Sequence, residues 1–306
     1  MNMKKSENVA LLMAFLGYAI FGFSFLFSKR ALDIATPFML VATRFTVAFL
    51  ILNALLLTKR FTLELKGKTI KVLFLVGLFQ PVLYFICETY GVKLLATSFI
   101  GSILALVPII SALFGFLFLQ ERVRLFQVIC AIFSVFGVFI TTWGQSMGSF
   151  SWLGFTLILL AVCSTSMFNV LSRKTSKQFS AFERTYVMFG LGSVVFSAMA
   201  LIQCRNNLQG LLIAPLLNSD FWISIIYLAG ISSVVAFLML NYAITNLDVA
   251  KAAIFANITT VVTIFAGVFI LHEDFGIPQI IGSIIIIASA YGVNRTPVSQ
   301  YSSNSH

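Results

Sequence analysis

Charged side chains are scarce in this chain. Asp, Glu, Lys and Arg make up 10% of its 306 residues, whereas 59% are hydrophobic and 33 residues are Phe. Soluble globular domains carry about 25% charged residues, so this composition excludes an ordinary water-soluble surface. We therefore expect the lipid bilayer to be the solvent of this protein.

Histidine and cysteine, which supply many metal ligands and nucleophiles, are also rare. The histidines are His272 and His306, and the cysteines are Cys87, Cys130, Cys163 and Cys204. Their spacing fits no metal site, and the sequence has no HExxH, phosphate-binding loop or Gly-x-Ser-x-Gly motif. We predict no metal, no cofactor and no enzymatic activity, and we keep a membrane-embedded enzyme as an alternative.

Apolar runs long enough to cross a bilayer follow one another along the chain, separated by short polar breaks. A membrane helix needs about 20 mostly apolar residues. The runs lie at 9–28, 38–58, 70–90, 96–119, 125–143, 152–171, 182–203, 221–243, 250–271 and 278–294. We predict an all-α integral membrane protein with ten transmembrane helices. The first run is too long for a secretory signal, and Lys29-Arg30 follows it in place of a cleavage site, so we expect it to be retained.

The net charge of +10 is unevenly distributed between the two sides of the predicted bundle. Lys29, Arg30, Lys93 and Arg205 fall on one side, fifteen other Lys and Arg residues fall on the side of the termini, and Arg44 lies within a helix. Basic residues favour the cytoplasmic side of membrane proteins. The bias predicts cytoplasmic termini in a cell membrane, which we expect to be the bacterial cytoplasmic membrane, and it does not indicate a nucleic-acid partner.

One segment of the sequence recurs. The stretch 90–121 matches 242–273 at an offset of 152 residues, with Tyr90 on Tyr242, Gly115 on Gly267 and Glu121 on Glu273. Because each half has five predicted helices, an odd number, the second copy must enter the membrane in the opposite orientation. Inverted repeats of this kind occur in many transporters.

The repeat also divides the chain into segments. The predicted segments are a tail at 1–8, a first repeat at 9–143, a loop at 144–151, a second repeat at 152–294 and a tail at 295–306.

These motifs resemble the EamA-like family of the drug/metabolite transporter superfamily. The residues that carry the resemblance are the run Tyr-Gly-Val-Lys-Leu-Leu-Ala-Thr-Ser at 90–98, Ser28-Lys29, Pro37, Arg44, Pro108 and Glu121, and in the second half Tyr242, Ala250, Asn257 and Glu273. Thr260 stands where the first half has Pro108. The resemblance implies two inverted five-helix units around a central cavity, lined mainly by helices 1, 3, 4, 6, 8 and 9.

The resemblance also implies a function. We expect a secondary transporter that moves a small organic molecule, such as an amino acid-like metabolite, an amine or a toxic compound, by alternating access, with efflux as one direction. Its energy would come from an ion gradient, with H⁺ or Na⁺ as the ion, or from exchange. A lipid flippase or a channel is the closer alternative, and a homodimer is an open possibility for assembly.

Polar residues within the apolar runs mark the candidate site. Gln80, Tyr84 and Glu88 follow at helical spacing and are predicted to share one face. Glu88 is predicted to bind a cationic group or to exchange a proton; the alternative is a structural Glu88 that reaches the interface or pairs with Arg44 or Lys93.

Arg44, and Arg184 in the second half, have two open interpretations. Each can extend toward lipid headgroups, or it can hold a substrate carboxylate by two parallel hydrogen bonds.

The remaining predicted cavity residues are Tyr18, Asn169, Tyr242, Asn257 and Thr260. Hydroxyl and amide groups of this kind also bond neighbouring helices, as we expect for Thr165 and Ser172 next to Asn169. Pro81 and Pro108 are predicted hinges, since proline removes a helix hydrogen bond. Glu121 and Glu273 are predicted to accept hydrogen bonds at the start of the helix that follows each of them.

Overall fold

The computed structural model describes residues 2–59, 61–65, 68–119, 125–143, 150–246 and 249–295. Within these residues every regular element is a helix. The helices of the first half are α1 (Asn2–Leu32), α2 (Pro37–Leu57), α3 (Lys71–Gly77), η1 (Leu78–Leu83), α4 (Tyr84–Leu94), α5 (Thr97–Leu104), α6 (Val107–Leu119) and α7 (Leu125–Trp143). Those of the second half are α8 (Trp152–Thr175), α9 (Ala181–Cys204), η2 (Gln209–Ile213), α10 (Ala214–Leu217), α11 (Ser219–Ile225), η3 (Ile226–Ala236), α12 (Phe237–Asn246), α13 (Val249–Phe265), η4 (Ala266–Ile270) and α14 (Ile277–Arg295).

Seven helical segments of the described chain are long and apolar enough to cross a membrane. They are Asn8–Leu32, Pro37–Leu57, Lys71–Leu94, Thr97–Phe118, Trp152–Thr175, Ala181–Cys204 and Ser219–Ala243. Three shorter apolar helices cover Val128–Thr141, Asn257–Ile270 and Ile277–Gly292. The all-helical class is as predicted, whereas the full set of ten crossings and the inversion of the repeat stay predictions.

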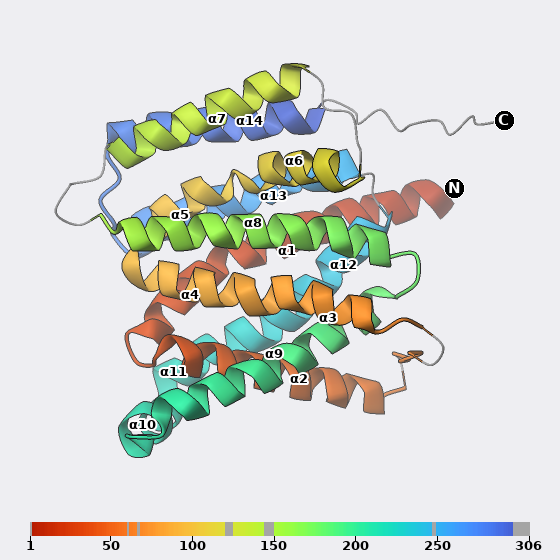
Figure 1. Cartoon of the computed structure of the whole chain (residues 1–306), viewed down its shortest axis with the longest axis vertical. Coiled ribbons are helices and arrows are strands. Elements are labelled where there is room, and N and C mark those ends of the chain that lie inside the picture. The colour runs from red at the N-terminus through yellow and green to blue at the C-terminus, as the bar shows by residue number, and fades with distance from the viewer. Residues whose placement is uncertain are drawn as a thin grey trace.

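The helices form a layered bundle (Figure 1). The pair α7 and α14 lies side by side at one edge, and α2 packs on α9 toward the opposite edge. In Figure 1, α1 begins at the end of the bundle where α14 ends. The segment from η2 to α10 lies at the other end.

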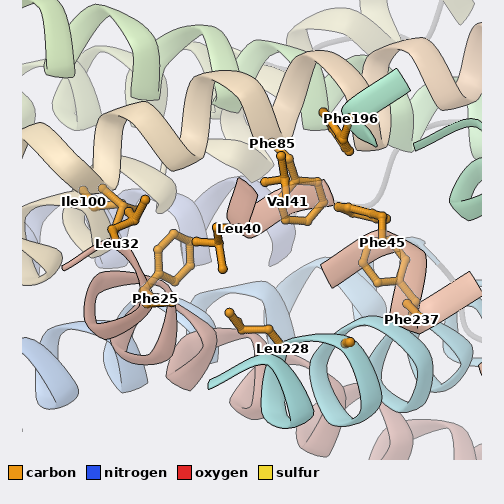
Figure 2. Packing of buried hydrophobic residues seen from close by; sticks show 14 of the residues in the cluster. Phe25, Leu32, Leu40, Val41, Phe45, Phe85, Ile100, Phe196, Leu228 and Phe237 are labelled. Carbon is orange, nitrogen blue, oxygen red and sulfur yellow. The ribbon is translucent and has the colours of Figure 1, made fainter. Parts of the chain in front are cut away.

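Phenylalanine and aliphatic side chains together fill the core between these layers (Figure 2). The ring of Phe45 on α2 meets Phe85 on α4 at 4.9 Å and Phe189 on α9 at 5.2 Å, both edge to face. Phe237 on α12 meets Phe189 in the same manner at 5.2 Å. Edge-to-face pairs hold rings in defined orientations, so this core fixes α2, α4, α9 and α12 relative to one another.

Candidate functional site

Arg44 lies in the interior of the bundle and is only 2% exposed. Its Nε donates to Ser233 Oγ at 2.9 Å and its Nη2 donates to Ser232 Oγ at 3.2 Å. Both serines belong to η3, a π-helical stretch of the kind that recurs at functional sites. The guanidinium also lies 4.5 Å from the ring centre of Phe85. The interpretation in which Arg44 extends toward the headgroups is therefore wrong, because its charged end is held inside the protein.

Glu88 is the opposite charge at this site, and it is also 2% exposed. Its Oε2 accepts a hydrogen bond from Thr89 Oγ1 at 3.1 Å. Arg44 and Glu88 lie within electrostatic range of each other, but in the described part of the chain they form no direct ion pair. Among the described residues, Nη1 of Arg44 and Oε1 of Glu88 have no hydrogen-bond partner.

Two tyrosines complete the surroundings of these charges. Tyr84, one turn before Glu88 on α4, and Tyr227 on η3 both lie within electrostatic range of Arg44. Tyr227 is fixed from two sides, since its hydroxyl donates to the Ile20 carbonyl at 3.0 Å and its ring stacks on Phe27 at 4.1 Å.

We call the set Arg44, Tyr84, Phe85, Glu88, Tyr227, Ser232 and Ser233 the Arg44–Glu88 cluster. It joins α2, α4 and η3, so both halves of the chain contribute to it. An unpaired charge at membrane depth costs about 2.5 to 3.5 kcal/mol on insertion scales. Two such charges, contributed by different helices in the interior of the bundle, make this cluster the candidate functional site.

The third predicted transmembrane helix is interrupted just before the cluster. Gln80 has non-helical backbone angles (φ −142°, ψ 116°), and Pro81 follows it. The helical spacing that placed Gln80 on a face with Tyr84 and Glu88 therefore breaks at Gln80. The carbonyl of Phe79 accepts a hydrogen bond from Ser164 at 2.6 Å, and Gln80 Oε1 accepts one from Thr165 at 3.1 Å.

A second interruption separates α5 from α6 at Ala105 and Leu106, just before Pro108. The carbonyl of Val107 accepts a hydrogen bond from Ser166 at 3.3 Å, and Asn169 Nδ2 donates to Ser111 Oγ at 3.3 Å. The Phe79 carbonyl also accepts from the backbone N–H of Tyr84, so the hydroxyl of Ser164 adds a second hydrogen bond beside the break. The polar residues of α8 thus bond to both interrupted helices, and a hinge role for Pro81 and Pro108 stays a prediction.

Hydrogen bonds join the C-terminal part of α8 to the N-terminal part of α9. Arg184 is buried, and its Nη1 donates to the carbonyl and the hydroxyl of Ser172 at 3.0 and 2.7 Å. The interpretation in which Arg184 extends toward the headgroups is therefore wrong, because its charged end is bonded inside the protein. Next to it, Glu183 closes a capping box with Ser180 and forms an ion pair with Lys68 at 2.7 Å. The Ser-x-x-Glu pattern at 180–183 is a readable signal for this cap.

Glu273 lies at the far end of the bundle and caps α5. Its two carboxylate oxygens accept hydrogen bonds from the backbone N–H groups of Thr97 and Ser98, each at 2.7 Å. Our prediction that it caps the helix following it, α14, is wrong in the choice of helix, although the chemistry is the expected one. Lys29 donates to the carbonyls of Val92 and Leu95 and interacts electrostatically with Glu273. Glu121 lies outside the described residues.

The other predicted cavity residues lie outside the Arg44–Glu88 cluster. Tyr18 is half-buried, and its carbonyl accepts a hydrogen bond from Thr259 at 2.9 Å where α1 meets α13. Asn257 and Thr260 are buried on α13, and Asn257 Oδ1 has no partner within the described chain. Tyr242 on α12 is 39% exposed. The structure thus brings Arg44, Tyr84 and Glu88 together, and it puts Gln80 and Asn169 at the helix breaks.

Four residues of the cluster, Phe85 among them, were missed by sequence reasoning. Tyr227, Ser232 and Ser233 lie in an apolar run, where a serine hydroxyl usually bonds within its own helix or to a neighbour. Nothing in the spacing of these residues indicates that they face an arginine 188 residues away. No group of three or more His, Cys, Asp or Glu side chains in the described chain is arranged to hold a metal ion.

Comparison with known proteins identifies transporters as the relatives of this chain. The sequence profile of the EamA-like transporter family matches residues 8–143 and again 152–295. The "Uncharacterized transporter YcxC" of Bacillus subtilis is 33% identical over 95% of this chain and 94% of its own length. An "S-adenosylmethionine/S-adenosylhomocysteine transporter" of Chlamydia muridarum is 26% identical over 66% of this chain and 67% of its own length. One solved crystal structure superposes with a TM-score of 0.66 at 19% identity, covering 92% of this chain and 95% of that one, and this likeness concerns the fold alone.

Proposed function

This chain belongs to the EamA-like transporter family, so it is a multi-pass membrane transporter and not an enzyme. From this premise we propose that it is a secondary transporter of a small organic metabolite. We further propose that it binds its substrate at the Arg44–Glu88 cluster. One observation carries the proposal. Two buried, opposite charges on different helices lie within electrostatic range of each other without direct contact, and each keeps one hydrogen-bonding atom unused among the described residues. Burying such a pair in a membrane protein costs free energy, and ionisable residues at membrane depth are therefore usually functional.

The proposed architecture is ten transmembrane helices in two inverted repeats, 9–143 and 152–294, in a bacterial cytoplasmic membrane with both termini in the cytoplasm. The double match of the family profile supports the repeat. The seven long and three shorter apolar helices support the number of crossings. Inverted repeats pack in two nearly equivalent ways, which is the physical basis of alternating access.

The substrate proposal is a metabolite in the class of amino acid-like molecules and amines. The Chlamydia relative, whose name gives S-adenosylmethionine and S-adenosylhomocysteine as its substrates, supports a charged metabolite of this kind. A gradient of H⁺ or Na⁺, or exchange, would supply the energy. For H⁺, Glu88 is the proposed coupling residue, because it is a buried carboxyl next to the proposed substrate position.

Counterflow in liposomes tests the transporter proposal. Liposomes that contain the purified protein are loaded with one unlabelled metabolite at a time, and entry of the same labelled metabolite is followed. We expect Glu88→Gln to slow this entry by about tenfold or more, because a neutral amide loses the charge that holds a cationic group. Glu64→Gln, which removes an exposed carboxylate, is the control.

Two results would contradict the proposal. Lipid scrambling without counterflow of any soluble metabolite would favour the lipid flippase. Counterflow that Glu88→Gln and Glu64→Gln leave equally fast would remove Glu88 from the transport mechanism.

A further inference from the structure

We propose that the substrate is a zwitterion whose carboxylate is bound by Arg44 and whose amine is bound by Glu88. This inference rests on the proposed function, and it names the chemical class that the same site selects. A substrate with one charge would leave the opposite charge of the site without a partner. A molecule with both charges satisfies both groups at once.

The Arg44 side fixes how the carboxylate is held. Nε and Nη2 are already bonded to Ser233 and Ser232, and the guanidinium lies against the face of Phe85. These contacts hold the guanidinium in one plane before any ligand arrives. Both N–H groups of Nη1 and one N–H of Nη2 remain for the ligand, so the guanidinium can hold a carboxylate by charge-assisted hydrogen bonds, including a paired contact.

The Glu88 side is arranged in the same way. Thr89 donates to Oε2 and leaves Oε1 for an ammonium group. Glu88 is on α4 and Arg44 is on α2, so the two ends of the substrate would contact different helices. Ser232 and Ser233 attach the arginine to η3, in the second half of the chain. A zwitterion therefore links elements from both halves.

The alternative is that the two charges only hold α2 against α4. A structural pair would be expected to make direct contact, because attraction in a core offsets the cost of burial only at close range with good geometry. No direct ion pair joins Arg44 to Glu88 in the described chain, whereas Lys68 and Glu183 meet at 2.7 Å. The observed arrangement favours a group between the two charges.

Binding to the unmodified protein tests the proposal without any variant. Purified protein is titrated with each proteinogenic amino acid and with S-adenosylmethionine, and stabilisation against heat gives the affinity. The tightest ligand is then compared with its carboxamide, which keeps only the amine charge, and with its N-acetyl form, which keeps only the carboxylate charge. We expect each single-charge form to bind about tenfold or more weakly, because one buried charge stays unpaired.

Variants assign each charge to its residue. Arg44→Gln should abolish the preference for the parent ligand over its carboxamide, and Glu88→Gln should abolish the preference over its N-acetyl form. Arg205→Gln and Glu64→Gln remove one exposed charge of each sign, and both preferences should persist in them. A purely structural pair would weaken all three ligands together and leave their ratios unchanged. If Arg44→Gln does not fold, Arg44→Lys keeps the positive charge and should retain the preference over the carboxamide.

The outcomes separate this inference from the proposed function. A single-charge form that binds as tightly as the parent overturns the zwitterion. So does the absence of binding by every amino acid and by S-adenosylmethionine, if liposomes still exchange another metabolite, in which case the transporter proposal stands. Absence of exchange for every solute, together with lipid scrambling, contradicts the transporter itself.

Discussion

At the residue scale, the buried charge of Arg44 is held by partners from a distant part of the chain. Arg44 depends on serines 188 and 189 residues away. The sequence was sufficient to select Arg44, Tyr84 and Glu88, because an ionisable residue in an apolar run is costly and therefore conspicuous. It was insufficient to select Ser232 and Ser233, because hydroxyl groups are common in membrane helices and their partners depend on packing.

The two serines should matter for stability as well as for position. Ser232→Ala combined with Ser233→Ala removes both hydrogen bonds from the buried guanidinium. Bonds to charged groups contribute about 1.5 to 3 kcal/mol each, so we expect the free energy of unfolding to fall by about 2 kcal/mol or more. Thermal unfolding in detergent measures the change.

The matched control for this prediction is Ser224→Ala, because the Ser224 hydroxyl donates within its own helix to the Asp220 carbonyl. A loss in the double variant no larger than in the control would mean that the serines do not hold Arg44.

At the element scale, helix ends and close helix contacts set the arrangement. The capping box at Ser180 and Glu183 is local, so it can be read from the spacing of the two residues. The cap on α5 cannot be read in this way, since Glu273 reaches Thr97 from 176 residues away. Our prediction assigned Glu273 to α14 because α14 follows it in the sequence. Tertiary packing instead brings Glu273 to the start of α5, the helix that it caps.

Glu273→Gln should loosen the start of α5. The amide keeps one acceptor oxygen but loses the negative charge that the N-terminus of a helix favours. We expect a loss of about 1 kcal/mol in unfolding free energy, within the usual range for a helix cap. Asp274→Asn, an adjacent exposed carboxylate, should leave stability unchanged. Equal melting temperatures for the two variants would argue against the cap.

Close approach of α7 and α14 depends on glycine. A Cβ on Gly282 would lie 2.5 Å from the Gly137 carbonyl oxygen and 2.9 Å from the Thr141 nitrogen. Both are backbone atoms, so Gly282→Ala must push the helices apart, and we expect a cost of about 1 to 3 kcal/mol.

Gly230→Ala is the control for this contact, since the nearest atom to its Cβ would be 4.0 Å away. Helix propensity favours alanine at both positions by about 0.5 to 1 kcal/mol. The two substitutions should therefore change the thermal midpoint in opposite directions. A shift of the same sign and size would show that the packing tolerates the methyl group.

At the scale of the whole molecule, composition and charge predict the class of protein, whereas at a single site they do not predict which side chains meet. The all-helical class follows from apolar runs in a chain with few charges. Which helices touch does not follow, because lipid-facing and protein-facing positions are both apolar. The position of α7 beside α14 at one edge (Figure 1) depends on contacts between the two helices, such as that of Gly137 with Gly282, which neither segment reveals alone.

Orientation in the membrane can be tested with single cysteines. Lys177 and Asn207 are both exposed, one at each end of α9 and its flanking turns. In a variant without native cysteines, Asn207→Cys should react with a membrane-impermeant maleimide on intact bacteria, and Lys177→Cys should react only after permeabilisation. Labelling of both positions on intact cells would contradict cytoplasmic termini.

The hydrogen bonds from α8 also have a consequence for the order of synthesis. The breaks at Gln80 and Ala105 lie in the first half of the chain, but the hydroxyl groups that bond to carbonyls beside the breaks, those of Ser164 and Ser166, are translated later. A nascent chain that ends near residue 143 would lack both of these donors, and with them the hydrogen bonds that join the interrupted helices to α8. We therefore expect the first five apolar segments to stay loosely associated near the translocon until residues 152–175 emerge and complete them.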